Sequence, residues 1–469
     1  MDFIVSFFGD TLCYGNVKLK VNGIPGIPKG VTAVIGDNGS GKTTLARVLD
    51  KGRYAFGNRL FTAKERMAVK VLTFTDIHSL AGIDVMRYDQ RLEASENEFV
   101  PTVAEVIGRG DNSERRAQLS EAFNLHDVLD KKVNFLSSGE LRKLLIINAL
   151  VELPDLLILD NPYIGLDVAS RKELDTALST ISSQGVSIVL LLSEPAELPA
   201  YTDHVVQMAN RELVSLAPLS EYKPLAHRKV EPLSLESIPV RQRTFKPCDI
   251  AFSITDGHLR YGERTILEDV NWTVKMGESW ALSGPNGSGK SLLLSYVCAD
   301  HPQAYANKII LFDRRRGTGE SIWEIKDRIG YVNPEMSIYF KSTKPIEEII
   351  AQGVRPSLER YRKSTPEEAR EVDQWLEILG ISNLKGRLYS ELSSSEQRLV
   401  LLCSAVAKQP QLLILDEPFH GMDPSNKQRI KQIVNALIEK NGSSIIFVTH
   451  CEDETPQCVT KKFSLTKHS

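Results

Sequence analysis

A glycine-rich pattern, G-x-x-x-x-G-K-[ST], occurs twice in the chain, at residues 36–43 and 284–291. In this pattern the backbone N–H groups of a loop surround the phosphates of a nucleotide, and the glycines let the main chain approach the oxygen atoms. Apolar residues such as Val31–Ile35 and Trp280-Ala281-Leu282 precede the two loops. The sequence therefore predicts a buried strand, a loop and then a helix whose N-terminus faces an anion. A flexible glycine-rich turn, the alternative, does not explain the Lys-Ser ending of the second loop.

The residue types in the two loops indicate a task for each position. Lys42 and Lys290 are expected to reach the β- and γ-phosphates, and the hydroxyl groups of Thr43 and Ser291 are expected to bind Mg²⁺. The residues expected to hold a nucleotide are Gly36, Asp37, Asn38, Gly39, Ser40, Gly41, Lys42, Thr43 and Thr44 in the first loop and Gly284, Pro285, Asn286, Gly287, Ser288, Gly289, Lys290 and Ser291 in the second.

Other segments recur with a period of about 250 residues. Leu156–Asp160 and Leu412–Asp416 have the same sequence, and Leu136-Ser137-Ser138-Gly139-Glu140 corresponds to Leu392-Ser393-Ser394-Ser395-Glu396. Strand-like apolar runs alternate with helical patterns in both halves. This alternation predicts two α/β units with mostly parallel sheets.

The two units are expected to be separate domains. Five prolines (Pro218, Pro224, Pro232, Pro239 and Pro247) lie between them, with few apolar runs, which predicts an extended linker. We predict a first domain at residues 1–216, a linker at 217–247 and a second domain at 248–469. Polar, helix-like stretches at Ala117–Leu129 and Thr365–Leu379 predict a helical subdomain inserted in each domain.

The composition is typical of a globular protein, with 42% apolar and 25% charged residues. The longest apolar runs, such as Ile188–Leu192, have the length of a strand, and the first residues do not resemble a signal peptide. The six cysteines form no C-x-x-C pair, so we expect a reduced, cytoplasmic compartment. The net charge of −3 argues against a surface that coats nucleic acid, although local basic patches are compatible with it.

The order of these motifs resembles the ATPase domains of ABC proteins. A phosphate loop, then L-S-S-G-E or its counterpart L-S-S-S-E, then four apolar residues and an aspartate follow in this order in both halves, so the resemblance covers nearly the whole chain. The segments 311–323 and 329–332 also resemble the bacterial twin ATPases of the ModF/PhrA group. That group is named for molybdenum transport and photorepair, but no residue of this sequence indicates molybdate or DNA repair.

The resemblance implies roles for residues outside the loops, with ATP and Mg²⁺ as cofactors. Asp160 and Asp416 end buried strands, where Mg²⁺ would offset the cost of an isolated carboxylate. Glu417 would polarise the attacking water, and His450 would contact the γ-phosphate, so that the expected catalytic residues are Glu417, His450 and Lys290. The aromatic residues expected to stack on adenine are Tyr14 and Tyr261, which could instead be ordinary tyrosines at strand ends. The remaining residues expected to bind nucleotide are Ser137, Ser138, Gly139, Glu140 and Ser393.

ABC domains usually pair head to tail, so that each serine-rich signature faces the phosphate loop of the other domain. This pairing would make the chain an intramolecular pseudodimer with one complete composite site, formed by the second phosphate loop and the first signature. The other composite site would have Asn161 in place of the catalytic glutamate, Glu194 in place of the histidine and Ser395 in place of the signature glycine. Asn161 carries no negative charge, and Glu194 would repel a γ-phosphate.

Two further departures concern possible partners. The family's glutamine, which senses the partner surface, is replaced by Asp76 and Pro334, and this argues against conventional coupling to a membrane subunit. The run Arg314-Arg315-Arg316 would be a solvated surface or a contact for an anionic partner such as nucleic acid.

Three functions are compatible with these features. The first is an ATPase that powers transport, cytoplasmic or peripheral on the inner face of the cell membrane and bound to separately encoded permease subunits. The second is an ATPase that acts on a macromolecule such as a ribosome or nucleic acid. The third, a nucleotide-dependent clamp without catalysis, is disfavoured by Glu417 and His450. We expect the first, on the family name alone.

Overall fold

The chain forms two compact units, which are described separately here. The computed structural model describes residues 2–15, 17–51, 60–62, 67–73, 101–108, 113–133, 136, 138–152, 154–164, 166, 168–225, 230–239, 245–261, 264–285, 288–298, 301–334, 336, 340–356, 359, 362–449 and 452–466. The first unit is Met1–His227 together with Gly421–Pro424, and the second is Arg228–His420 together with Ser425–Ser469. Within the described residues, no helix has the length and apolar character needed to span a membrane.

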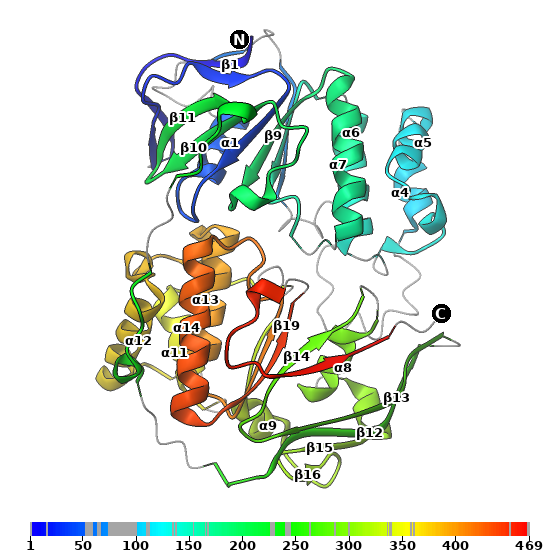
Figure 1. Ribbon diagram of the computed structural model, residues 1–469, viewed down its shortest axis with the longest axis vertical. Coiled ribbons are helices and arrows are strands. Elements are labelled where there is room, and N and C mark those ends of the chain that lie inside the picture. The colour runs from blue at the N-terminus through cyan, green and yellow to red at the C-terminus, as the bar shows by residue number, and fades with distance from the viewer. Residues whose placement is uncertain are drawn as a thin grey trace. The chain divides into compact units, whose positions relative to one another are not determined.

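The first unit is built on an eight-stranded sheet (Figure 1). In sheet order its strands are β2 (Thr11–Tyr14), β3 (Val17–Lys20), β11 (Glu212–Pro218), β10 (His204–Ala209), β5 (Val31–Ile35), β9 (Ser187–Leu192), β8 (Leu156–Asp160) and β7 (Val69–Thr73). A second sheet contains β4 (Gly26–Pro28), β1 (Phe3–Phe7) and β6 (Leu60–Thr62). The helices are α1 (Lys42–Lys51), α4 (Val103–Gly108), α5 (Ser113–Ala122), α6 (Ser138–Val151) and α7 (Val168–Ser183).

The central strands of this sheet are buried on both faces. Strand β9 is buried at every residue, and its side chains alternate between two cores. Ile188, Leu190 and Leu192 belong to one apolar cluster, whereas Val189 and Leu191 belong to the other. This is the two-residue period of a strand, and it explains why the strand is one continuous apolar run.

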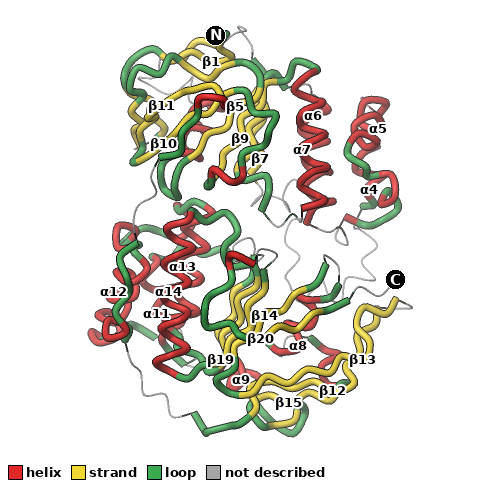
Figure 2. The backbone as a smooth tube through the Cα atoms, in the orientation of Figure 1, coloured by secondary structure: helices red, strands yellow, loops and turns green. Residues whose placement is uncertain are grey.

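The second unit contains a five-stranded parallel sheet and a four-stranded antiparallel sheet (Figure 2). The parallel strands are, in sheet order, β17 (Ile329–Val332), β18 (Leu412–Asp416), β19 (Ser444–Val448), β14 (Ser279–Ser283) and β20 (Lys461–Ser464). The antiparallel strands are β13 (Arg264–Lys275), β12 (Ile250–Tyr261), β15 (Lys308–Leu311) and β16 (Arg314–Arg315). The helices are α8 (Lys290–Val297), α9 (Ile322–Arg328), α11 (Ile346–Val354), α12 (Pro366–Leu379), α13 (Ser394–Ala407) and α14 (Pro424–Asn441).

The sequence repeat is a structural repeat. The parallel strands run in the order β7-β8-β9-β5-β10 in the first unit and β17-β18-β19-β14-β20 in the second. In both units the strand before the phosphate loop is separated by one strand from the strand that ends in aspartate. The α/β fold class predicted from the sequence is confirmed.

Each unit also has a group of three helices in mutual contact: α4, α5 and α6 in the first, and α11, α12 and α13 in the second. Helix α12 follows the predicted stretch because Thr365 and Glu368 form a capping box at its start and Gly380, with φ of 72°, ends it. The predicted helix at Ala117–Leu129 is shorter in the structure. Helix α5 stops at Ala122, and Asn124 takes a left-handed conformation with φ of 52°.

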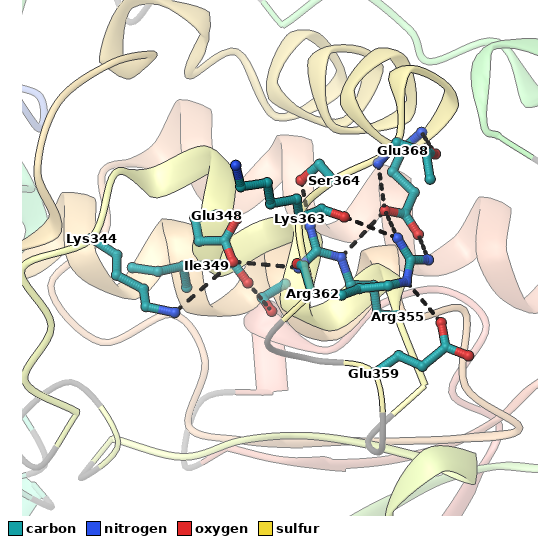
Figure 3. A network of polar contacts seen from close by, with 11 residues as sticks. Lys344, Glu348, Ile349, Arg355, Glu359, Arg362, Lys363, Ser364 and Glu368 are labelled. Atoms are coloured by element: carbon teal, nitrogen blue, oxygen red, sulfur yellow. Dashed lines mark hydrogen bonds and ion pairs between the residues drawn. The ribbon is translucent and has the colours of Figure 1, made fainter.

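A buried ionic network joins α11 to α12 (Figure 3). The Arg355 guanidinium is fully buried and lies 3.3 Å from Glu348 and 3.3 Å from Glu368. It also donates to the backbone oxygen of Arg362 at 2.6 Å. Arg362 itself pairs with Glu368 at 2.5 Å. The network fixes the chain between the two helices, because each charge lies beside a partner of opposite sign.

Parts of the predicted linker pack against the two units. Ala217 and Pro218 complete strand β11, and Leu219 and Tyr222 pack against the core of the first unit. Further along, Ile238 is buried, and its backbone oxygen accepts a hydrogen bond from Lys440 of α14 at 2.7 Å. The domain boundaries given above stay a prediction.

Candidate nucleotide-binding sites

The second phosphate loop connects β14 to α8, as its sequence predicts. Lys290, the first residue of α8, donates to the backbone oxygens of Gly284 at 2.7 Å and Pro285 at 3.0 Å, so the loop curls around the ammonium group. Gly289 precedes the helix with φ of 89°, and a Cβ atom there would lie 2.7 Å from Leu267 Cδ2. Both the conformation and the space therefore require glycine.

The first loop has the same geometry between β5 and α1. Lys42 donates to the backbone oxygens of Gly36 at 2.5 Å and Asp37 at 3.0 Å. Its side chain is buried, and this burial lowers its pKa, while the nearby Asp160 carboxylate acts in the opposite direction. A buried ammonium beside a glycine-rich turn at a helix N-terminus favours a multiply charged anion such as a polyphosphate.

In each unit the residue after the loop lysine meets the aspartate at the end of a distant strand. Thr43 Oγ1 donates to Asp160 Oδ2 at 2.9 Å, and Ser291 Oγ donates to Asp416 Oδ2 at 3.3 Å. The carboxylates are buried, and burial raises the pKa of Asp160. A buried carboxylate beside a hydroxyl group offers the oxygen ligands that Mg²⁺ prefers. The residues of both sites therefore fit a nucleotide with Mg²⁺.

The residues that follow the two aspartates share one backbone geometry. Asn161 and Glu417 are left-handed, with φ of 53° and 46°, and each donates its backbone N–H to the neighbouring strand. The Asn161 side chain is held at both ends: Nδ2 donates to Asp160 Oδ1 at 3.0 Å, and Oδ1 accepts from Ser193 Oγ at 3.2 Å. This orientation of the amide follows from its hydrogen-bond partners.

Glu417 has a partner that the sequence reasoning missed. His420 Nε2 lies 2.9 Å from Glu417 Oε2, and both side chains are largely buried, with 17% and 8% of their surface exposed. His450, the residue expected to contact the γ-phosphate, lies outside the described residues. The only sequence signal for His420 is its position three residues after the glutamate, in the tight turn Glu417–His420.

The serine-rich segments lie at the starts of equivalent helices. Ser393 caps α13: its hydroxyl group accepts from Glu396 N and lies 2.8 Å from the Glu396 carboxylate. Ser395 is buried in the first turn of α13. Ser138 and Gly139 lie in the first turn of α6, followed by Glu140, which pairs with Lys131 at 2.9 Å.

The remaining predicted residues lie around the two loops or beyond the described chain. Tyr14 ends β2, and the Arg47 guanidinium carbon lies 5.9 Å from the centre of its ring; Tyr261 ends β12. Glu194 precedes the short turn Pro195–Glu197 after β9. Asn38, Gly39, Ser40, Gly41 and Ser288 lie between a strand and a helix, and Thr44 lies in the first turn of α1. Asp76, Ser137, Asn286 and Gly287 lie outside the described residues.

Comparisons with known proteins agree with this geometry. The family model described as ABC transporter matches residues 26–164 and 267–420. The ABC transporter ATP-binding protein ModF of Escherichia coli (strain K12) is 35% identical over 446 residues, which cover 92% of this chain and 90% of the relative. An uncharacterized ABC transporter ATP-binding protein of Schizosaccharomyces pombe (strain 972 / ATCC 24843) is 31% identical. The match covers 92% of this chain and 91% of the relative.

Two solved structures match most of the chain. One is the complex of the archaeal ribosomal stalk protein aP1 with the ribosome recycling factor aABCE1, with a TM-score of 0.53 at 18% identity, covering 97% of this chain and 86% of the other. The other, a model of ribosome-bound archaeal Pelota and ABCE1, has a TM-score of 0.57 at 18% identity. The match covers 94% of this chain and 73% of the other chain. At these identities the likeness concerns the fold alone. The family match and the two relatives confirm the resemblance read from the sequence: the chain belongs to the ABC transporter family and is a twin ATP-binding protein with two tandem ABC domains.

Proposed function

We propose that this protein hydrolyses ATP with Mg²⁺ and that hydrolysis takes place at the phosphate loop of the second unit. The observation that carries the proposal is the Glu417 carboxylate, which directly follows Asp416 and is held by His420 at 2.9 Å. A general base must be an acceptor that is placed and oriented. At the equivalent position of the first unit, Asn161 offers an amide that cannot accept a proton from water at neutral pH.

The other residues of the second site bind and orient the nucleotide. The N–H groups at the start of α8 and the Lys290 ammonium would hold the β- and γ-phosphates, and Ser291 and Asp416 would hold Mg²⁺. The metal ion, when bound, neutralises charge on the phosphates. Lys42, Thr43 and Asp160 would hold a second nucleotide in the first unit, where we propose binding with little or no hydrolysis.

Steady-state ATPase rates of matched variants test this proposal. Glu417→Gln should lower the rate on the order of 10²–10⁴-fold, because it removes the general base and keeps the phosphate loop. Asn161→Ala is the control at the equivalent position and should change the rate much less. Equal losses in the two variants would contradict catalysis in the second unit.

The head-to-tail pairing of the signatures and phosphate loops stays a prediction. Under this pairing Gly139→Asp, a change in the first half, should lower hydrolysis as strongly as Glu417→Gln. Retained turnover in Gly139→Asp would contradict the pairing and leave the role of Glu417 intact.

We propose further that hydrolysis powers a transport system through separately encoded membrane subunits. The names of the two relatives, which match over nine-tenths of the chain, support this role. A second candidate, action on a macromolecule such as the ribosome, is favoured by Asp76 and Pro334, which stand where the family's partner-sensing glutamine is expected. Affinity capture with ATP-bound Glu417→Gln protein separates the two: recovery of membrane subunits supports transport, and recovery of ribosomal subunits contradicts it.

A further inference from the structure

His420 and Glu417 make a close polar contact inside the second unit. His420 Nε2 lies 2.9 Å from Glu417 Oε2, which is within the distance of an ion pair when the imidazole is protonated. Both side chains are largely buried, so the imidazole limits the positions that the carboxylate can take.

The turn that carries the two residues is anchored on several sides. The backbone N–H of Glu417 donates to Val448 of β19 at 2.9 Å. Phe419 is buried, and its ring centre lies 5.5 Å from that of Phe447. The backbone oxygen of His420 accepts a hydrogen bond from Arg398 of α13. His420 therefore reaches Glu417 from a backbone that is held by both the sheet and α13.

Arg398 connects this turn to the serine-rich helix. Its guanidinium is buried, and burial lowers its pKa to about 10, so it remains charged at neutral pH. It lies on α13, which begins directly after Ser393. The helix that carries the signature sequence thus also fixes the backbone of His420.

The first unit lacks this histidine and anchors its turn at a different residue. Arg142 of α6 donates to the backbone oxygen of Pro162, the counterpart of Pro418, at 2.8 Å, whereas Arg398 donates to that of His420. Ile164 lies four residues after Asp160, as His420 lies four residues after Asp416. Isoleucine has no donor, and the Asn161 amide is held by Asp160 and Ser193 instead. A histidine is therefore present in the unit that has a glutamate after the strand-end aspartate, and it is replaced by isoleucine in the unit that has an asparagine there.

The backbone of Glu417 explains why such a partner matters. A left-handed glutamate is strained, and strained backbone persists where its surroundings hold it, commonly at functional sites. A glutamate side chain has three rotatable bonds, and its carboxylate would otherwise sample several orientations. A base that accepts a proton from water must keep its carboxylate in one of these orientations.

We propose that His420 is a positioning residue for hydrolysis in the second unit, and that its imidazole, 2.9 Å from the Glu417 carboxylate, holds that carboxylate in the orientation that receives the proton of the attacking water. This inference rests on the proposed function of Glu417. His420 acts through Glu417, whose carboxylate accepts the proton.

Two substitutions of nearly equal length separate a polar contact with Glu417 from packing alone. His420→Gln keeps an N–H donor on a flexible side chain, whereas His420→Met has similar length and no donor. We expect kcat to fall about 10- to 100-fold in His420→Met and much less in His420→Gln, since a misplaced base loses rate on this scale. The KM for ATP and the melting temperature should stay close to those of the unchanged protein in both variants. Ile164→Ala, the matched change in the first unit, should leave the rate unchanged.

The outcomes separate this inference from the proposed function. If Glu417→Gln is inactive while His420→Met keeps kcat, or if the Met and Gln variants lose kcat equally, His420 does not position the base through a polar contact. A loss confined to the melting temperature would also overturn the inference, because it indicates a structural role only. If Glu417→Gln hydrolyses ATP at the original rate, the proposed function itself fails. In the Glu417→Gln background, His420→Met should cause no further loss of rate.

Discussion

Asn161 and Glu417 occupy equivalent positions in the two units and share a left-handed backbone, with φ of 53° and 46°. Asparagine tolerates this conformation because its short polar side chain bonds locally, and glutamate does so only at a cost. The first unit therefore has a relaxed residue tied into hydrogen bonds, and the second has a strained, buried carboxylate. The two units thus differ at the position proposed for the general base.

Exchanging the two residues should change stability in opposite directions. Glu417→Asn should raise the free energy of unfolding by about 1 kcal/mol, because it removes backbone strain and a buried charge, and should abolish most hydrolysis. Asn161→Glu should lower the free energy of unfolding by about 2 kcal/mol, because it places a second carboxylate beside Asp160 and breaks two hydrogen bonds. Scanning calorimetry of the two variants measures both effects. Destabilisation by Glu417→Asn would show that the left-handed conformation imposes no strain.

Each phosphate loop should bind one nucleotide independently of hydrolysis. We expect two ATP molecules per chain in equilibrium dialysis with Mg²⁺, since both loop lysines and both hydroxyl–aspartate pairs are in place. Lys42→Ala should reduce the number to one and keep part of the hydrolysis. Lys290→Ala should also reduce it to one and abolish hydrolysis. One ATP per chain in the unchanged protein would show that the first loop has lost binding.

The strand, loop and helix around each site could be predicted because their signals are local. Continuous apolar runs mark parallel strands that are buried on both faces, and the glycine pattern marks the loop between strand and helix. The pairing of Ser291 with Asp416 required the family resemblance, since the two residues are 125 positions apart.

Other features depend on parts of the chain that are distant in sequence. The hydrogen bond from Ser193 to Asn161 depends on the neighbouring strand β9, which Ser193 follows. The contact of His420 with Glu417 depends on a turn whose backbone accepts a hydrogen bond from the distant Arg398. The environment of the run Arg314–Arg316 could not be predicted from the sequence either. Its sequence allows a solvated surface or a contact with an anion, but Arg316 is buried against Glu320 at 2.7 Å, whereas Arg314 and Arg315 are exposed.

The three arginines should therefore differ in their effect on stability. Arg316→Ala should lower the free energy of unfolding by about 3 kcal/mol, because it leaves the Glu320 carboxylate buried without its partner and removes the contact with the Tyr305 ring, 4.8 Å away. Arg314→Ala, the matched control, should change it by less than about 0.5 kcal/mol. All four tryptophans, Trp272, Trp280, Trp323 and Trp375, lie in the second unit, so urea unfolding followed by tryptophan fluorescence reports on that unit. Equal effects of the two variants would contradict a structural role for Arg316.

The network around Arg355 predicts how acid destabilises the helices of the second unit. Burial opposes ionisation of Glu368, but the hydrogen bonds from Arg362, the Thr365 backbone N–H and Arg355 outweigh it and hold its pKa below the usual value of 4.5. A lowered pKa stabilises the folded state above the unfolded-state value, and this contribution is lost as the pH falls through the folded-state pKa. Glu368→Gln should therefore lower the free energy of unfolding by about 1–2 kcal/mol at pH 7, and this difference should shrink below about pH 4. Tryptophan fluorescence in urea measures it, since Trp375 is buried in α12.

The neighbouring Glu367 provides the control for this measurement. Its side chain is 73% exposed and pairs with the exposed Arg370 at 3.3 Å, so Glu367→Gln should leave the urea midpoint nearly unchanged at either pH. Arg355→Met should destabilise the unit at pH 7 as Glu368→Gln does, because it leaves the buried carboxylate with fewer partners. A difference between Glu368→Gln and the unchanged protein that stays constant from pH 7 to about pH 3 would show that Glu368 acts through packing rather than through its charge.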